Sequence, residues 1–348
     1  MRMTVRDVAR AAGVSRTTVS NVFSGRVKYS EETRAAVLAA AASLGYRPNL
    51  AARSLITHQT GLIGLVLPPD MSPNTLAHNP FYNIIMDSVY AVLRDEAYFD
   101  LLIYSTHYQQ SQAQISDRIA ARNVDGILAI GEFDREFLKD LEASAIPVVL
   151  IDNYAPETYP GFSCVNSDDE AGGFLATQHL IEQGYQKIAA CVLDMTSPLM
   201  GRRVNGYRKA MAGAGLQPAV FFQAGAPFEV GIGFAHLLTA QHFDAAFCTE
   251  DMLAVGVLHR LLKDGVAVGQ AFGLIGFDNI ATGTQVNPEL TTIDQHIYEK
   301  GQTAARILLE VLKKTRPPGI KLTMPVELVV RETSHRKPPP NRKGRKKA

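Results

Sequence analysis

The sequence of 348 residues predicts a small all-α head that contains a helix-turn-helix, followed by a larger α/β body built on parallel sheets. Helix-capping residues at regular intervals predict the head. Short, continuous apolar runs that alternate with amphipathic segments predict the body, because this pattern is typical of parallel strands covered by helices on both faces. The length also exceeds what one hydrophobic core usually holds, so we expect more than one domain.

Charge is distributed unevenly along the chain, although the formal net charge is only +1. Residues 1–60 carry nine Lys or Arg and three Asp or Glu, and residues 336–348 carry seven basic residues and no acidic one. The segment between them has 19 basic and 31 acidic residues. Two basic ends on an acidic body indicate that nucleic acid contacts the ends of the chain. We expect residues 335–348 to form a disordered tail, which either adds affinity for phosphates or only increases solubility.

Three helices are predicted in the head. Thr4 and Asp7 form a capping-box pattern at the start of the first helix, and Gly13 breaks that helix. Ser15 can cap a second helix and Ser30 a third. The alternative is an ordinary Ala-rich three-helix bundle whose polar second helix is only solvated. The side chains that we expect the second helix to expose are Arg16, Thr17, Ser20 and Asn21.

Two segments carry a resemblance to a known family. TVRDVARAAGVSRTTVSNVF and SEETRAAVLAAAASLGYRPNLAARSL resemble the DNA-binding head and hinge of the LacI/GalR family of bacterial transcription regulators. Similar pieces continue through the body, among them IGLVLP, VDGILAI, RRVNGYRKAM and GLIGFDNI, so the resemblance covers nearly all of residues 4–334. It implies a body like that of the periplasmic sugar-binding proteins, with two lobes.

Domain boundaries follow from this resemblance and from a seam near residues 161–164. The resemblance implies that the chain crosses between the lobes three times. We expect a head at 1–48, a hinge helix and linker at 49–60 and a core at 61–334, in which lobe 1 comprises about 61–162 and 292–322 and lobe 2 about 163–291 and 323–334.

The hinge segment NLAARSLI, residues 49–56, has helix-forming composition but only about two turns. Isolated helices this short are marginal in water, so we expect it to fold on operator DNA against the same segment of a second subunit. The resemblance places Leu55 at a position that wedges into the minor groove; ordinary packing of Leu55 is the alternative. The predicted DNA-contacting residues of the hinge are Asn49, Ala52, Arg53 and Leu55.

In the head, the family's base-reading positions correspond to Arg16, Thr17 and Asn21. Arg16 either grips guanine or binds a phosphate, and Asn21 can pair with adenine. Ser20 and Thr4 complete the predicted DNA-contacting set. One head is too small for specific binding, so we expect a homodimer on double-stranded operator DNA with an inverted repeat. The amphipathic segment 81–93 belongs either to the dimer surface or to the core.

The resemblance also implies a small-molecule effector between the lobes. Arg203 in RRVNG and Asp278 in GFDN match the family's main effector-contacting positions, and Phe81 and Tyr82 can stack on the ligand. A cationic fork and a carboxylate suit a sugar, polyol or nucleoside. The alternatives are a surface ion pair for Arg203 and a turn or helix cap for Asp278. Glu250 stands where many relatives carry Asn, so it either favours a hydroxyl-rich or cationic ligand or caps the following helix.

Other classes of function fit the sequence poorly. Cys164, Cys191 and Cys248 are far apart without a CxxC pair, so we expect buried free thiols and no metal site. We also expect no catalytic residue, cofactor or membrane segment, and a cytoplasmic location. Residues 168–170 (Asp-Asp-Glu) fit a solvated helix start better than an acid/base pair. A solute-binding module without DNA function is the alternative, but it leaves the basic head unexplained.

Overall fold

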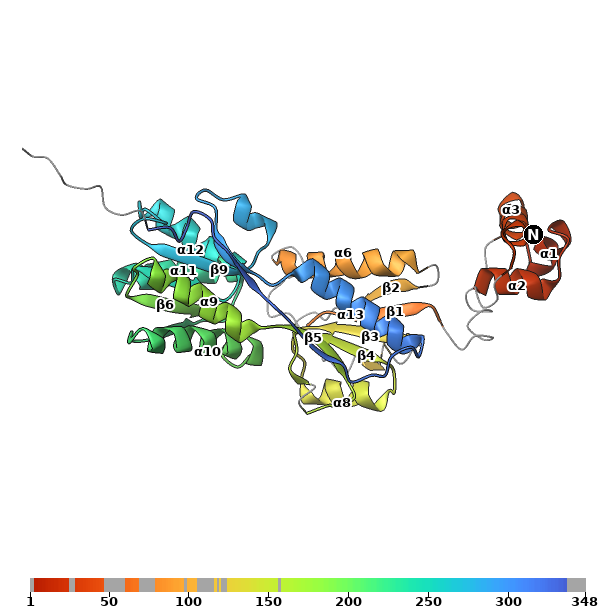
Figure 1. Ribbon diagram of the computed structural model, residues 1–348, viewed down its shortest axis with the longest axis horizontal. Coiled ribbons are helices and arrows are strands. Elements are labelled where there is room, and N and C mark those ends of the chain that lie inside the picture. The colour runs from red at the N-terminus through yellow and green to blue at the C-terminus, as the bar shows by residue number, and fades with distance from the viewer. Residues whose placement is uncertain are drawn as a thin grey trace, which may run out of the picture. The chain divides into compact units, whose positions relative to one another are not determined.

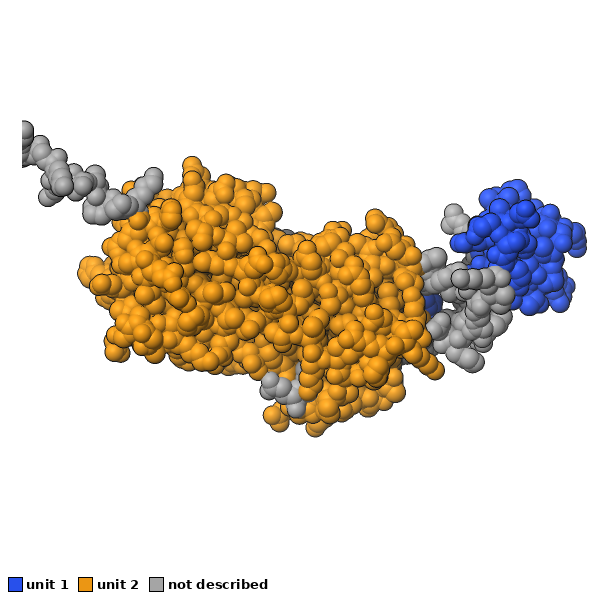
Figure 2. Space-filling model, viewed as in Figure 1, with its two compact units in different colours: residues 1–62 blue, residues 63–348 orange. Residues whose placement is uncertain are grey.

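In the computed structural model the chain forms two compact units, residues 1–62 and residues 63–348 (Figure 2). The predicted hinge contacts Asn49, Ala52, Arg53 and Leu55 lie outside the described residues and stay predictions. The same holds for the tail after residue 336. The structure describes residues 3–24, 29–46, 60–68, 79–96, 99–104, 116–117, 119, 124–155 and 158–336.

The head consists of α1 (Val5–Ala11), α2 (Arg16–Ser24) and α3 (Glu31–Ser43). Local capping defines the helix starts. The backbone N–H and the hydroxyl of Thr4 both donate to Asp7 Oδ2, at 3.0 and 2.7 Å. Ser15 Oγ accepts from the backbone N–H of Thr18, at 3.0 Å, and Ser30 Oγ caps α3 in the same way. The core of the head is small and aliphatic: Val8, Ala9, Val19, Val37, Ala40 and Ala41.

The larger unit contains two sheets of six strands each, which form two lobes (Figure 1). In the first sheet the order is β11-β5-β4-β3-β1-β2, and the pairs β1–β3, β3–β4, β4–β5 and β5–β11 are parallel. Its strands are β1 (Leu62–Val66), β2 (Asp100–Tyr104), β3 (Gly126–Ile130), β4 (Val148–Ile151), β5 (Ser163–Ser167) and β11 (Lys321–Met324).

The second sheet has the order β12-β10-β9-β8-β6-β7, in which β12 alone runs antiparallel to its neighbour. The parallel sheets predicted from the apolar runs are therefore confirmed. The strands of the second sheet are β6 (Ile188–Val192), β7 (Ala219–Phe222), β8 (Ala245–Cys248), β9 (Gly273–Asp278), β10 (Thr291–Asp294) and β12 (Glu327–Val329).

Helices cover both sheets. The first lobe has α6 (Pro80–Asp95), α8 (Arg135–Ala143) and α13 (Ile297–Leu312), and α6 packs against α13 (Figure 1). The second lobe has α9 (Asp169–Glu182), α10 (Pro198–Gly213), α11 (Pro227–Ala240) and α12 (Asp251–Lys263). On α6, Ile85 and Val89 are fully buried in the core, which favours core packing for that face of the segment 81–93. Tyr90 is 54% exposed, and the dimer surface stays a prediction.

The predicted lobe boundaries need a correction of a few residues. β5 was predicted to open the second lobe, but it pairs with β4 and β11 in the first sheet. Most of β10 was predicted in the first lobe, but it pairs with β9 in the second sheet. The apolar pattern locates a strand without specifying its sheet, which the pairing partners decide. The chain therefore crosses between the lobes after β5, after β10 and after β11.

The three crossings lie side by side. Ser167 Oγ, at the first crossing, donates to Gln295 Oε1 at the second, at 3.1 Å. The backbone N–H of Asp168 donates to the carbonyl of Met324 at the third crossing, at 2.9 Å. The connection between the lobes is thus three hydrogen-bonded segments.

Two glycines let α9 and α10 pack backbone to backbone. A Cβ atom on Gly206 would collide with the carbonyl oxygen of Glu170, and one on Gly173 would collide with the carbonyl oxygen of Arg203. This close approach places the side chain of Arg203 beside the start of α9.

Candidate functional site

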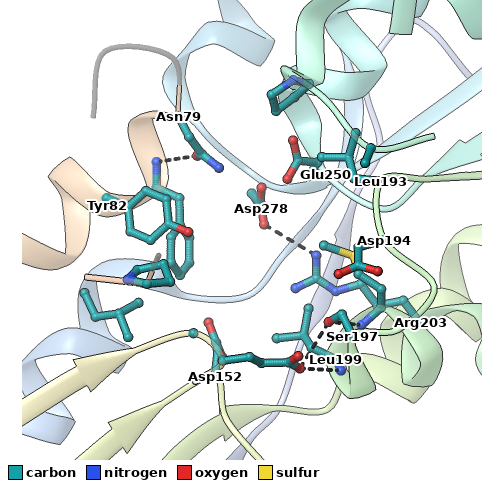
Figure 3. A pocket seen from close by; sticks show the side chains of 18 of the residues that line it. Asn79, Tyr82, Asp152, Leu193, Asp194, Ser197, Leu199, Arg203, Glu250 and Asp278 are labelled. Carbon is teal, nitrogen blue, oxygen red and sulfur yellow. Dashed lines mark hydrogen bonds and ion pairs between the residues drawn. The ribbon is translucent and has the colours of Figure 1, made fainter. Parts of the chain in front are cut away.

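A cavity of about 580 Å³ lies between the two lobes. Its walls come from segments that follow the carboxyl ends of strands, where parallel sheets bind ligands. Glu132 follows β3. Asp152 follows β4, and Glu250 follows β8 (Figure 3). The five predicted effector-contacting residues all line this cavity: Phe81, Tyr82, Arg203, Glu250 and Asp278.

Arg203 is almost completely buried in the wall of the cavity, at 3% exposure. Its Nε donates to Asp169 Oδ1 at 2.8 Å, and its Nη1 donates to the carbonyl of Thr249 at 2.5 Å. The guanidinium carbon also lies 3.6 Å from the centre of the Phe277 ring. The alternative of a surface ion pair is therefore wrong. Protein groups already hold Arg203 in one orientation.

Asp169 corrects the prediction of a solvated helix start at residues 168–170. Asp168 does cap α9, since its carboxylate accepts from the backbone N–H of Ala171. Asp169, however, is 1% exposed and accepts from both Arg203 and the hydroxyl of Tyr154, at 2.8 Å each. Successive side chains at the start of α9 point in different directions, so the carboxylate of Asp168 faces solvent and that of Asp169 faces the lobe interface. The residue types alone do not reveal this orientation.

A second buried network was missed in the sequence. Lys300 is fully buried, and its Nζ donates to both oxygens of Asp152, at 2.6 and 2.8 Å, and to Gln295 Oε1. Gln295 Nε2 in turn donates to Asp278 Oδ1. The helical spacing of α13 could have revealed Lys300. It lies one turn before Ala304 and two turns before Leu308, which places a charged side chain on the apolar face of the helix.

Asp278 has its carboxylate in this network. It accepts from Gln295, and Arg203 Nη1 lies 3.9 Å away. Burial raises the pKa of the Asp278 carboxyl to about 7, although Arg203 and Lys300 favour the charged form. Its side-chain partners Gln295 and Arg203 thus belong to the lobe interface, which argues against the alternative of a turn cap.

Glu250 differs from the other cavity carboxylates. It precedes α12, yet its side chain makes no capping hydrogen bond, so the helix-cap alternative is not supported. The side chain is 7% exposed, and its Oε1 has no hydrogen-bond partner within the described residues. Burial raises the pKa of this carboxyl to about 8, with a further contribution from the charge of Asp278.

Phe81 and Tyr82 form the aromatic part of the cavity wall. Asn79 caps α6 by accepting from the backbone N–H of Phe81, and the two rings meet edge to face with centroids 5.4 Å apart. Phe81 is 9% exposed and packs in the core of the first lobe, whereas Tyr82 is half-buried. Tyr82 is therefore more exposed than Phe81.

The predicted DNA-reading residues lie on α2 of the head. Arg16, Thr17 and Ser20 are exposed. Asn21 is half-buried, and its Nδ2 donates to the hydroxyl of Tyr29 at 3.2 Å. Thr4 is exposed and belongs to the capping box of α1, so its contact with DNA stays a prediction.

Over the described ranges no group of three or more His, Cys, Asp or Glu is arranged to hold a metal ion. None of the helices in the same ranges is long and apolar enough to cross a membrane. Cys164, Cys191 and Cys248 are all buried free thiols, as predicted.

Comparison with known proteins supports both units. Residues 4–49 match the family model of bacterial regulatory proteins, lacI family, and residues 177–334 match a periplasmic binding protein-like domain. The HTH-type transcriptional repressor PurR of Vibrio campbellii is 33% identical over 95% of this chain and 98% of its own length. Catabolite control protein A of Priestia megaterium is 30% identical over 96% of this chain and 100% of its own.

Solved structures show the same architecture. The transcriptional regulator CelR in complex with cellobiose is 27% identical, with a TM-score of 0.73 over 95% of this chain and 100% of its own. The lac repressor dimer bound to operator and the anti-inducer ONPF is 24% identical, with a TM-score of 0.80 over 96% of this chain and 100% of its own. The helical head and the two-lobed core with parallel sheets are thus shared features.

Proposed function

The chain belongs to the lacI family of bacterial regulatory proteins and is therefore a DNA-binding transcriptional regulator, and we propose that a sugar, polyol or nucleoside in the interlobe cleft controls its operator affinity. One observation carries this proposal. The cavity of about 580 Å³ is lined by buried polar side chains from both lobes and by the half-buried ring of Tyr82. A few oriented polar groups with an aromatic wall suit a small polar ligand.

The arrangement of the cleft suggests how a ligand acts on the head. A ligand that contacts both lobes stabilises the arrangement of lobes in which both contacts are made. It can change operator affinity only by binding two conformations of the core unequally. The chain of bonds from Asp152 through Lys300 and Gln295 to Asp278 joins the lobes beside the cavity. We expect ligand contacts at Arg203 and Asp278 to bias this connection.

On DNA, we propose a homodimer whose two α2 helices read an inverted repeat and repress transcription. Arg16, Thr17 and Ser20 are exposed and free to enter the major groove, and Asn21 can exchange its bond to Tyr29 for one to a base. Two of the similar proteins are described as repressors, PurR of Vibrio campbellii and the lac repressor.

Gel-shift titration with DNA from the protein's own promoter region tests the DNA function. We expect a shift that is competed by the same fragment and not by unrelated DNA. A thermal-shift screen of sugars, polyols and nucleosides then identifies the effector, and a repeat of the gel shift with that compound should show altered operator affinity. A compound that binds the cleft tightly without changing operator affinity would contradict ligand control.

A further inference from the structure

The interlobe cavity carries more carboxylates than cations. Arg203 is the one cationic side chain among the described residues that line it. That cation is already engaged by Asp169 and the carbonyl of Thr249. The carboxylates that line the same cavity are Glu132, Asp152, Asp194, Glu250 and Asp278.

Most of these carboxylates have partners in the protein. Asp152 is paired with Lys300. Glu132 Oε1 accepts from Ser197 Oγ and from the backbone N–H of Leu199, at 3.1 and 3.2 Å. Asp194 accepts from the backbone N–H and the hydroxyl of Thr196. Asp278 accepts from Gln295. Four of the five carboxylates in the described lining thus have a partner in the protein, whereas Glu250 Oε1 has none among the described residues.

Glu250 points into the cavity from the second lobe, on the same side as Asp278 (Figure 3). Its Oε1 is buried without a hydrogen-bond partner in the described part of the chain, and no cationic atom lies within ion-pair distance of the carboxylate there. A buried polar atom without a partner costs free energy, and a buried carboxylate needs a counter-charge as well as donors. A ligand that supplies both removes this cost.

We propose that Glu250 selects a ligand that carries an alkylammonium group, such as an amino-polyol or an amino sugar, with the ammonium donating to Glu250 Oε1. This inference rests on the proposed function, because it names the ligand class of the same cleft. A neutral hydroxyl can satisfy the oxygen of the uncharged acid, but the ionised carboxylate then has only the charge of Arg203, beyond ion-pair distance, to offset it. The ammonium supplies both the donor and the counter-charge, and charge-assisted hydrogen bonds are about twice as strong as neutral ones.

Protonation makes the proposal testable by pH. Burial raises the pKa of Glu250 to about 8, so near neutrality the empty cleft holds mostly the uncharged acid. An alkylammonium binds the carboxylate and displaces this proton, so its affinity rises with pH until about pH 8. The charged or titratable groups around Glu250 are Asp278 from β9, Arg203 from α10, Cys248 from β8 and Asp251 from α12. Asp278 titrates in the same range, so a variant of Glu250 must separate their effects.

Two pairs of compounds provide the test, and in each pair one member carries one or two ammonium groups where the other has hydroxyl groups. The first pair is 1-amino-1-deoxy-D-glucitol and D-glucitol, and the second is putrescine and butane-1,4-diol. Calorimetry on the full-length protein at pH 6.5 and 8.5 should show that an amine binds at least about tenfold more tightly than its neutral partner at pH 8.5. That preference should shrink at pH 6.5, while the alkylammonium itself stays charged at both pH values.

Glu250→Gln, which keeps the size and removes the charge, should abolish the preference for the amine. Asp194→Asn is the matched control, because it removes a charge from an exposed carboxylate of the same cavity and should keep the preference. Equal binding within both pairs, or tighter binding of the neutral members, overturns the proposal. So does a preference that survives in Glu250→Gln.

The wild-type pH dependence gives a result even if Glu250→Gln does not fold, since an amine preference that does not grow from pH 6.5 to 8.5 also overturns the proposal. Operator binding separates this inference from the proposed function. A neutral sugar or polyol that changes the operator affinity in the gel shift would keep ligand control and exclude the ammonium. Absence of operator binding both with and without a bound compound would instead contradict the DNA function.

Discussion

The head and the interlobe cleft place their functional side chains in opposite environments. On α2, Arg16, Thr17 and Ser20 are exposed, and the polar bonds of the head join residues three to eight positions apart. In the cleft, Arg203 and Asp278 are buried, and the bond from Lys300 to Asp152 spans 148 positions. An exposed residue of α2 can therefore change at little cost to the fold of the head, whereas a buried cleft residue contributes to the fold and to the site.

This difference explains which substitutions can be interpreted simply. Loss of DNA binding after a change at the exposed Arg16, Thr17 or Ser20 reports recognition, because these side chains lie outside the core of the head. Loss of ligand response after a change in the cleft reports recognition and stability together. Removing Arg203, for example, leaves Asp169 buried without its cation.

Lys300→Met should destabilise the core by about 3–5 kcal/mol, because it leaves Asp152 buried and uncompensated. Urea unfolding followed by circular dichroism measures this loss. Lys263→Met is the control: Lys263 is exposed at the end of α12, and we expect a change within about 0.5 kcal/mol. A cost below about 1 kcal/mol for Lys300→Met would show that the cleft network is not needed for the fold.

Glu250→Gln should stabilise the unliganded core at high pH. A carboxyl whose pKa is raised to about 8 in the fold ionises first in the unfolded chain, so stability falls as pH rises from about 4 to 8. We expect the advantage of the variant over wild type to grow by about 2–4 kcal/mol between pH 5 and pH 8. Urea titrations of both proteins at pH 5 and pH 8 measure this advantage. If Glu250 were ionised at both pH values, the difference in unfolding free energy between variant and wild type would be the same at each.

Gly206→Ala should destabilise the second lobe by about 1–3 kcal/mol, since its Cβ would collide with the backbone of α9. Gly213→Ala on the same helix meets no atom within 4 Å and should be neutral or slightly stabilising. Thermal unfolding of both variants measures the contrast. Similar melting temperatures for the two would mean that α9 and α10 separate at little cost.

Asn21→Ala should lose about 1–3 kcal/mol of discrimination at one base position of the operator. The stability of the head should change little, because the bond from Asn21 to Tyr29 is long and half-buried. Competition gel shifts against single-base operator variants measure this discrimination. A uniform loss across all variants would assign Asn21 to backbone contact instead.

Ser30→Ala should cost the head about 0.5–2 kcal/mol, because Ser30 Oγ caps α3. Hydrogen exchange of α3 amides should become faster while exchange in the core does not change, since the head is a separate compact unit. Faster exchange in both units would contradict their independence.

Sequence patterns predicted the local features well. Thr4 with Asp7 located the start of α1, Ser15 and Ser30 located the caps of α2 and α3, and the apolar runs located the strands. The resemblance led to Arg203 and Asp278, which the fold brings into one cavity.

The partners of these residues could not be predicted. No sequence pattern marks the residues of the buried network, which follow β4 (Asp152) and β10 (Gln295) or lie in α13 (Lys300). Only the packing of these distant segments brings them together. In the sequence Asp169 cannot be distinguished from Asp168 and Glu170, because only the orientation of the first turn of α9 makes Asp169 the buried one of the three. The sequence also could not predict to which sheet β5 belongs, because a buried strand has the same apolar pattern in either lobe and only its pairing with β4 decides this.

The three hydrogen-bonded crossings between the lobes restrict the relative movement of the lobes to few degrees of freedom. A single linker would allow twisting and separation in any direction. With three segments bonded side by side through Ser167, Gln295 and Met324, separation stretches every segment, and twisting breaks the bonds between them. Bending about an axis along the crossings remains, so binding of ligands of different size should change one angle by different amounts.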